Sequence, residues 1–65
     1  MSVQYYHPEM NKTITIQDPD FGGGHSTITE TNGDRLTQTL QMRPDEVSHF
    51  VEGLLSNGWL KRQQL

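Results

Sequence analysis

The sequence has 65 residues, a mass of 7.4 kDa and a formal net charge of −3, which leaves room for a single domain spanning 1–65. It contains no cysteine, which excludes disulfides, thiolate catalysis and cysteine-ligated metal centres. No apolar run approaches the ~18 residues of a membrane-spanning helix. The N-terminal residues lack the basic and apolar regions of a signal peptide, so we expect a cytoplasmic protein with no membrane contact.

The small size of the chain limits its core. A domain of this length buries only about 60% of the surface of its unfolded chain. Without disulfides, a chain this short gains stability from idealised packing, from oligomerisation or from a partner. We therefore expect a homo-oligomer or a subunit of a complex.

Three segments, 12–17, 25–30 and 35–42, have the alternating pattern of half-buried β-strands. Each alternates apolar with polar residues, which predicts an antiparallel sheet with one face on a core. The residues expected on that core face are Ile14, Ile16, Ile28, Leu36, Leu40 and Met42.

The register of the sheet depends on the linker at 31–33. Its Asn-Gly pair is typical of a two-residue hairpin turn, which would pair Ile28 with Thr37. A three-residue loop with Gly33 in the left-handed conformation instead pairs Ile28 with Leu36. Burial favours the second arrangement, because a slip of one residue moves every side chain to the other face. The predicted rows are Ile14–Ile28–Leu36 and Thr15–Thr27–Thr37, with Lys12 opposite Glu30.

The segment 44–57 predicts an amphipathic helix. Pro44 suits the first helical position, and two acidic residues follow it where the helix dipole favours anions. Asn57 and Gly58 end the helix, with Gly58 as a left-handed residue and Trp59 packing back on Leu54. The apolar stripe consists of Val47, Phe50, Val51, Leu54 and Leu55.

The two ends of the chain are less strongly patterned. Residues 3–6 predict a further strand closed by a turn at 7–9, and residues 59–65 form either a short strand or a frayed end. The expected fold class is α+β: an antiparallel β-meander of three to four strands with one C-terminal amphipathic helix packed on one face.

No spacing of residues supports catalysis. Ser26, Ser48 and Ser56 lack a nucleophile motif, and a chain of this size has difficulty enclosing a pocket of about 300 Å³. We therefore predict that the chain is not an enzyme and carries no cofactor.

Histidines near acidic residues raise the hypothesis of a metal-dependent protein. His25 with Asp18 or Asp20 is the better candidate, although the loop does not match a calcium-binding pattern. The triplet Glu46, His49 and Glu52 lies on the polar side of the predicted helix, where a solvated surface is the simpler interpretation.

The face of the sheet opposite the helix is rich in threonine and glutamine and poor in charge. A solvated sheet face is one interpretation. The other is a docking surface, because covering uncharged side chains costs little desolvation. The leading functional hypothesis is a non-catalytic protein–protein interaction module, such as a small regulator, inhibitor or accessory subunit, that uses this face, the edge strands and the Phe21 loop. The candidate partner-binding residues are Phe21, Thr15, Thr27, Thr37, Thr39, Tyr5 and Trp59.

An alternative hypothesis is a nucleic-acid-binding module. Tyr5 and Tyr6 could stack on bases, and Lys61 and Arg62 could contact phosphates. The negative net charge of the chain opposes this hypothesis.

Overall fold

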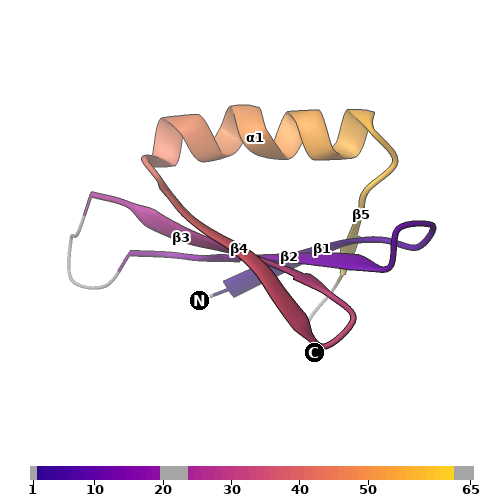
Figure 1. Cartoon of the computed structure of the whole chain (residues 1–65). Coiled ribbons are helices and arrows are strands. Elements are labelled where there is room, and N and C mark those ends of the chain that lie inside the picture. The colour runs from indigo at the N-terminus through magenta and orange to yellow at the C-terminus, as the bar shows by residue number, and fades with distance from the viewer. Residues whose placement is uncertain (1, 20–23, 63–65) are drawn as a thin grey trace.

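A computed structural model of the chain describes residues 2–19 and 24–62. The five strands pair antiparallel in one sheet, in the spatial order β4-β3-β2-β1-β5, and the helix lies across one side of it (Figure 1). The predicted α+β class is confirmed, with five strands in place of three or four. The elements are β1 (Ser2–His7), β2 (Lys12–Gln17), β3 (Ser26–Asn32), β4 (Arg35–Met42), α1 (Pro44–Ser56) and β5 (Leu60–Arg62).

The chain path explains how both ends of the sequence join the sheet. Strands β1 to β4 follow one another as a meander, and α1 then carries the chain back from β4 to the far side of β1. There β5 pairs with β1, so the described part of the C-terminal segment is a strand. The predicted N-terminal strand is also confirmed, and the turn after it contains Asn11 at φ 53°.

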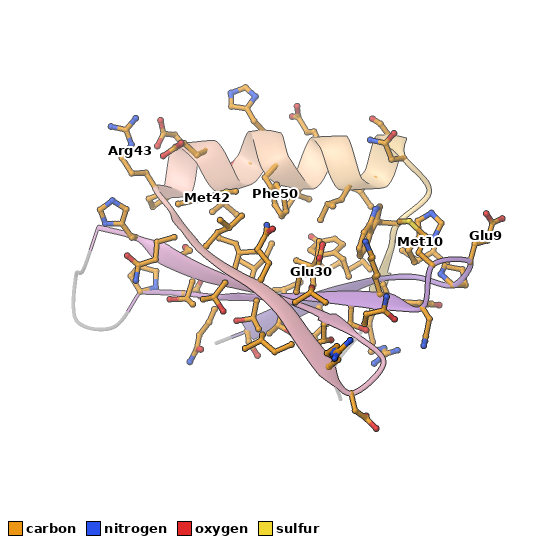
Figure 2. All side chains as sticks on the ribbon, in the orientation of Figure 1. Glu9, Met10, Glu30, Met42, Arg43 and Phe50 are labelled. Carbon is orange, nitrogen blue, oxygen red and sulfur yellow. The ribbon has the colours of Figure 1, made fainter. Side chains whose placement is uncertain are left out.

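The core lies between the sheet and α1 and is shallow. Side chains from the first three strands meet the end of the helix and the residue that follows Gly58 (Figure 2). Burying each such side chain contributes about 1.5–3 kcal/mol. The buried residues are Tyr5, Ile14, Ile16, Ile28, Leu54 and Trp59, with Val3, Met42, Val47, Phe50 and Val51 packed against them.

The predicted register of the sheet is wrong by two residues at the first hairpin. Ile28 pairs with Ile16 and not with Ile14, and Lys12 faces Asn32 and not Glu30. Because the shift is an even number of residues, Ile14, Ile16 and Ile28 still share the face beneath the helix, as predicted.

The second hairpin also differs from the predicted three-residue loop. Asn32 pairs with Arg35 across a two-residue loop that starts at Gly33, whose φ of 61° confirms the expected left-handed conformation. The loop also contacts the first hairpin, because the Gly33 N–H donates to the Asn11 carbonyl at 3.0 Å.

A β-bulge in β4 changes which residues reach the core. Glu30 pairs with Gln38, and the next residue, Thr31, pairs with Leu36, so Thr37 is an extra residue in β4. The Thr37 hydroxyl donates to the Glu30 carboxylate at 2.8 Å, which places Thr37 on the helix side of the sheet. Leu36, predicted to lie in the core opposite Ile28, instead lies on the opposite side and is 61% exposed.

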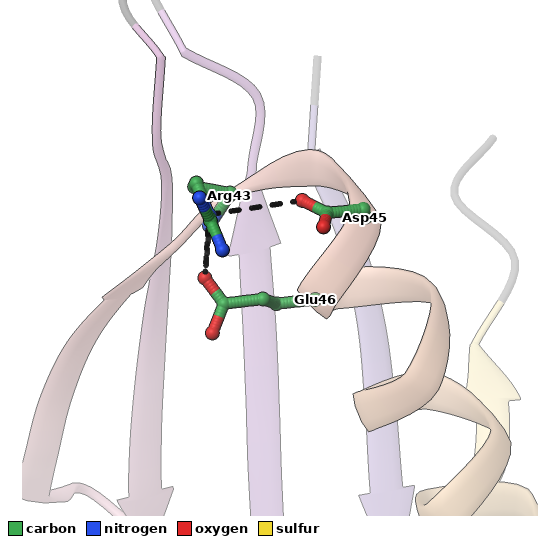
Figure 3. Close-up of polar contacts among 3 residues, drawn as sticks. All are labelled: Arg43, Asp45 and Glu46. Carbon is green, nitrogen blue, oxygen red and sulfur yellow. Dashed lines mark hydrogen bonds and ion pairs between the residues drawn. The ribbon is translucent and has the colours of Figure 1, made fainter.

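The first turn of α1 has the conformation that its sequence predicts. Arg43 is extended, as expected before Pro44, and its backbone N–H donates to the Glu46 carboxylate at 3.2 Å. The Arg43 guanidinium contacts the same carboxylate at 3.3 Å and that of Asp45 at 3.9 Å (Figure 3). These ion pairs are exposed, so the backbone hydrogen bond is the firmer constraint on where the helix begins.

The end of α1 confirms the predicted glycine cap. Gly58 has a φ of 89°, and the Trp59 N–H donates back to the Leu54 carbonyl at 3.1 Å. This turn directs Trp59 into the core, where its ring packs edge-on against the His7 ring with centroids 5.5 Å apart. The cap therefore joins the helix end to β1.

We expect Gly58→Ala to lower the free energy of unfolding by about 1–2 kcal/mol, because its φ lies in the left-handed region. The added Cβ would also lie 3.4 Å from His7 Nε2. The matched control is Gly53→Ala within α1, where a Cβ meets nothing within 4 Å and should stabilise by up to about 1 kcal/mol. Urea denaturation measures both variants, and equal stabilities would contradict the prediction.

Candidate functional site

The histidine and acidic residues proposed as metal ligands are exposed wherever the structure describes them. Within residues 2–19 and 24–62, no group of three or more His, Asp and Glu side chains is close enough to hold a metal ion. His25 and Asp18 are exposed, and Asp20 lies outside the described residues. On the helix, the Glu46 carboxylate contacts Arg43. The metal hypothesis stays a prediction without a described site.

The side of the sheet that faces away from α1 is the main uncovered surface in the described structure (Figure 1). We call it the open face. Its members follow from the strand pairing, because residues that pair across strands share a face and alternate with the core residues. The described residues of the open face are Ser2, Gln4, Tyr6, Thr13, Thr15, Gln17, Thr27, Thr29, Thr31, Leu36, Thr39, Gln41, Leu60 and Arg62.

The central row of the open face is a ladder of hydroxyl and amide side chains. It runs across four strands through Gln4, Thr15, Thr29 and Thr39. The Gln4 side-chain amide donates to the Thr15 hydroxyl at 3.3 Å. The row therefore presents short side chains with hydrogen-bonding groups and methyl groups.

The neighbouring row is more apolar. It runs from Leu60 through Tyr6, Thr13 and Thr31 to Leu36. Leu60 and Leu36 are both exposed, and each stands at one end of the row. The open face thus combines a polar, uncharged centre with apolar groups at both edges of the sheet.

Charge is nearly absent from this surface. Among the open-face residues that the structure describes, Arg62 is the one charged side chain. Its guanidinium lies over the Tyr6 ring, 5.0 Å from the centroid. Such a cation–π contact contributes about 0.5–1 kcal/mol when exposed. Covering the open face would therefore require little desolvation of charge.

The predicted threonine site is partly assembled. Thr15, Thr27 and Thr39 lie on the open face, as expected from the alternation of their strands. Thr37 does not, because the bulge places it beside Glu30 on the helix side. The predicted row Thr15–Thr27–Thr37 is therefore wrong, and Thr15 pairs with Thr29.

Two of the three aromatic residues proposed as partner contacts do not lie on the open face. Tyr5 and Trp59 lie in the core, 6% and 7% exposed, where they hold the sheet and the helix end together. Phe21 lies outside the described residues. Tyr6, the neighbour of Tyr5, is the aromatic residue that the open face presents.

The structure brings together two of the four residues of the nucleic-acid hypothesis, Tyr6 and Arg62, and separates Tyr5 and Lys61 from them. Lys61 pairs with Tyr5 and Arg62 pairs with Gln4, so the two cations point to opposite sides of the sheet. Tyr5 is buried and its ring cannot stack on a base. The four residues therefore do not form one patch, and nucleic-acid binding stays a prediction.

The open-face members that sequence reasoning missed include Leu36, Leu60 and Arg62. The alternation in 35–42 assigned Leu36 to the core, and nothing in those residues marks the bulge. For Leu60 and Arg62, the pairing of β5 with β1 was the missing information. The alternation of Tyr5 and Tyr6 did indicate that one of the two faces outward.

Comparison of the chain with models of protein families, with curated proteins and with solved structures finds no match. Within the described residues, no helix is both long and apolar enough to cross a membrane. The functional interpretation therefore depends on the residues of the surface itself.

The placement of Leu36 can be tested by stability. We expect Ile28→Val to lower the free energy of unfolding by about 0.5–1.5 kcal/mol, because Ile28 is 2% exposed in the core. Leu36→Val removes one methylene from an exposed side chain and should change stability by less than about 0.5 kcal/mol. Chemical denaturation compares the two, and a larger loss for Leu36→Val would contradict this assignment of faces.

Proposed function

We propose that the chain is a non-catalytic protein-binding module that contacts its partner through the open face. The observation that supports this most directly is the asymmetry of the sheet. One side is covered by α1, whereas the other presents an uncharged surface interrupted by Arg62 alone among the described residues. We place the chain among small regulators, inhibitors and accessory subunits.

The composition of the open face favours a particular kind of partner. Threonine and glutamine side chains offer donors, acceptors and methyl groups without a strong field, so they suit another uncharged surface more than an acidic or basic one. Leu36, Leu60 and Tyr6 supply apolar contacts toward the sheet edges. A second β-sheet packed about 10 Å away would match the pleated shape of this face.

The shallow core also supports a binding role. Even Ile28, the most buried of the core residues, retains 2% exposure, and six apolar side chains are buried among the residues that the structure describes. A small domain of this kind gains stability when a partner covers more of its surface. The uncovered sheet face provides the area for that gain.

The experiment compares two threonine substitutions on opposite sides of the sheet. Thr15→Arg places a long cation in the central row of the open face and should reduce recovery of the partner about tenfold or more. Thr37→Arg introduces the same side chain on the helix side and should leave recovery unchanged. Affinity purification from the native host with quantitative mass spectrometry measures both.

Circular dichroism confirms that each variant is folded before the comparison. The proposal fails if Thr15→Arg retains the same partners in the same amounts as the wild-type protein. It also fails if Thr37→Arg loses them equally, because the contact would then not depend on the open face.

A further inference from the structure

The outer edge of β4 is a second uncovered feature of the sheet. β4 is the last strand in the sheet order and pairs with β3 alone, so its other backbone edge has no partner within the described residues. Seven of its eight residues are exposed. An unpaired strand edge presents a row of N–H and C=O groups on which another strand can pair.

The two edges of the sheet are protected to different degrees. Two of the three described residues of β5, at the opposite edge, are Lys61 and Arg62. Positive charge discourages pairing at an edge. In β4 the segment 36–42 contains neither a charge nor a proline. The bulge at Thr37 interrupts pairing there but leaves 38–42 as regular strand.

We propose that two copies of the chain dimerise by antiparallel pairing of residues 38–42 of β4, with Leu40 at the two-fold axis. This inference does not depend on the proposed function, because it uses the edge of the sheet and not the open face. The pairs across the axis are Leu40 with its own copy, Thr39 with Gln41 and Gln38 with Met42.

The register follows from the faces of the residues. Leu40 pairs with Ile28, so alternation places Gln38, Leu40 and Met42 on the helix side, whereas Thr39 and Gln41 lie on the open face. Centring on Leu40 joins residues of the same face at every position. Shifting one strand by one residue would pair a residue of the helix side with a residue of the open face. Placing the two-fold axis at Thr39 or Gln41 would pair only part of the regular segment 38–42. The strand is thus complementary to itself in one register.

The exposure of Leu40 also favours a second copy of the chain as the partner of the β4 edge. Leu40 is 38% exposed although its neighbour in β3, Ile28, is 2% exposed. The second copy's Leu40 would cover the exposed part from the outer side, on the same face of the sheet. All the paired residues are uncharged, so no like charges meet. A strand of another protein need not match these residues in face and charge. A second copy of the chain is therefore the partner that we propose for this edge.

The first test measures mass against concentration by sedimentation equilibrium. The wild-type mass should rise from 7.4 kDa toward about twice that value as concentration approaches about 1 mM. Leu40→Lys places a charge at the axis and should keep the chain monomeric. Leu36→Lys is the matched control: it lies in the same strand, is more exposed and falls outside the paired segment, so its dimer should persist.

A wild-type mass that stays at 7.4 kDa throughout overturns the proposal and leaves the edge to a strand of another protein. Equal effects of Leu40→Lys and Leu36→Lys also overturn it. Circular dichroism shows whether either variant has lost the fold.

A second test checks the register with variants that leave the core untouched. Thr39 and Gln41 are both exposed on the open face and face each other across the proposed axis. The T39E/Q41K variant sets opposite charges together and should dimerise at least as tightly as wild type at low salt. The T39K/Q41K variant sets like charges together and should dimerise about tenfold more weakly.

Equal dimerisation of these two variants would exclude the proposed register. Thr15→Arg separates the two proposals, because Thr15 lies in β2, away from the β4 edge. Loss of a foreign partner with an unchanged dimer mass would support both proposals. A lost dimer with a retained foreign partner would contradict both.

Discussion

The structure depends on one geometric constraint: a single helix covers one side of a sheet that is wider than the helix. Neighbouring strands are about 4.8 Å apart and a helix with its side chains is about 10 Å wide, so one helix covers roughly two to three strands. The exposure of the helix-side residues follows this limit. Ile14 and Ile28, in β2 and β3, are buried, whereas Leu40 in β4 remains partly exposed. The open face and the β4 edge are what this limit leaves uncovered.

The bulge at Thr37 decides what those uncovered regions contain. Without it, the alternation of β4 would have put Leu36 on the same side as Leu40 and a threonine on the open face. With it, the Thr37 hydroxyl satisfies Glu30, and Leu36 becomes an apolar group at the rim of an otherwise polar surface. One extra residue thus changes the chemistry of both faces, because it reverses the alternation of everything between it and the hairpin.

Local rules predicted the helix and the inner strands, since their signals lie within a few residues of one another. Pro44 and Gly58 mark the two ends of the helix, and the alternation around Ile14 indicates a strand; each of these signals acts on the adjacent residues. The register was wrong because it depends on hydrogen bonds between strands, and an Asn-Gly sequence is compatible with more than one loop. The sequence left residues 59–65 as either a strand or a frayed end, because the described strand there is defined by its pairing with β1, which is distant in the sequence. The predicted threonines therefore lie on the predicted face of the sheet except where the bulge intervenes.

The two uncovered surfaces are compatible with each other. Antiparallel pairing of β4 with its copy joins residues of like face, so both helices lie on one side and both open faces on the other. The dimer would extend the open face across two chains and leave its centre uncovered. Stacking of the open face on a sheet partner, in turn, leaves the β4 edge accessible. A protein with this geometry can use its edge for self-assembly and its face for recognition, and a change at one of these surfaces need not disturb the other.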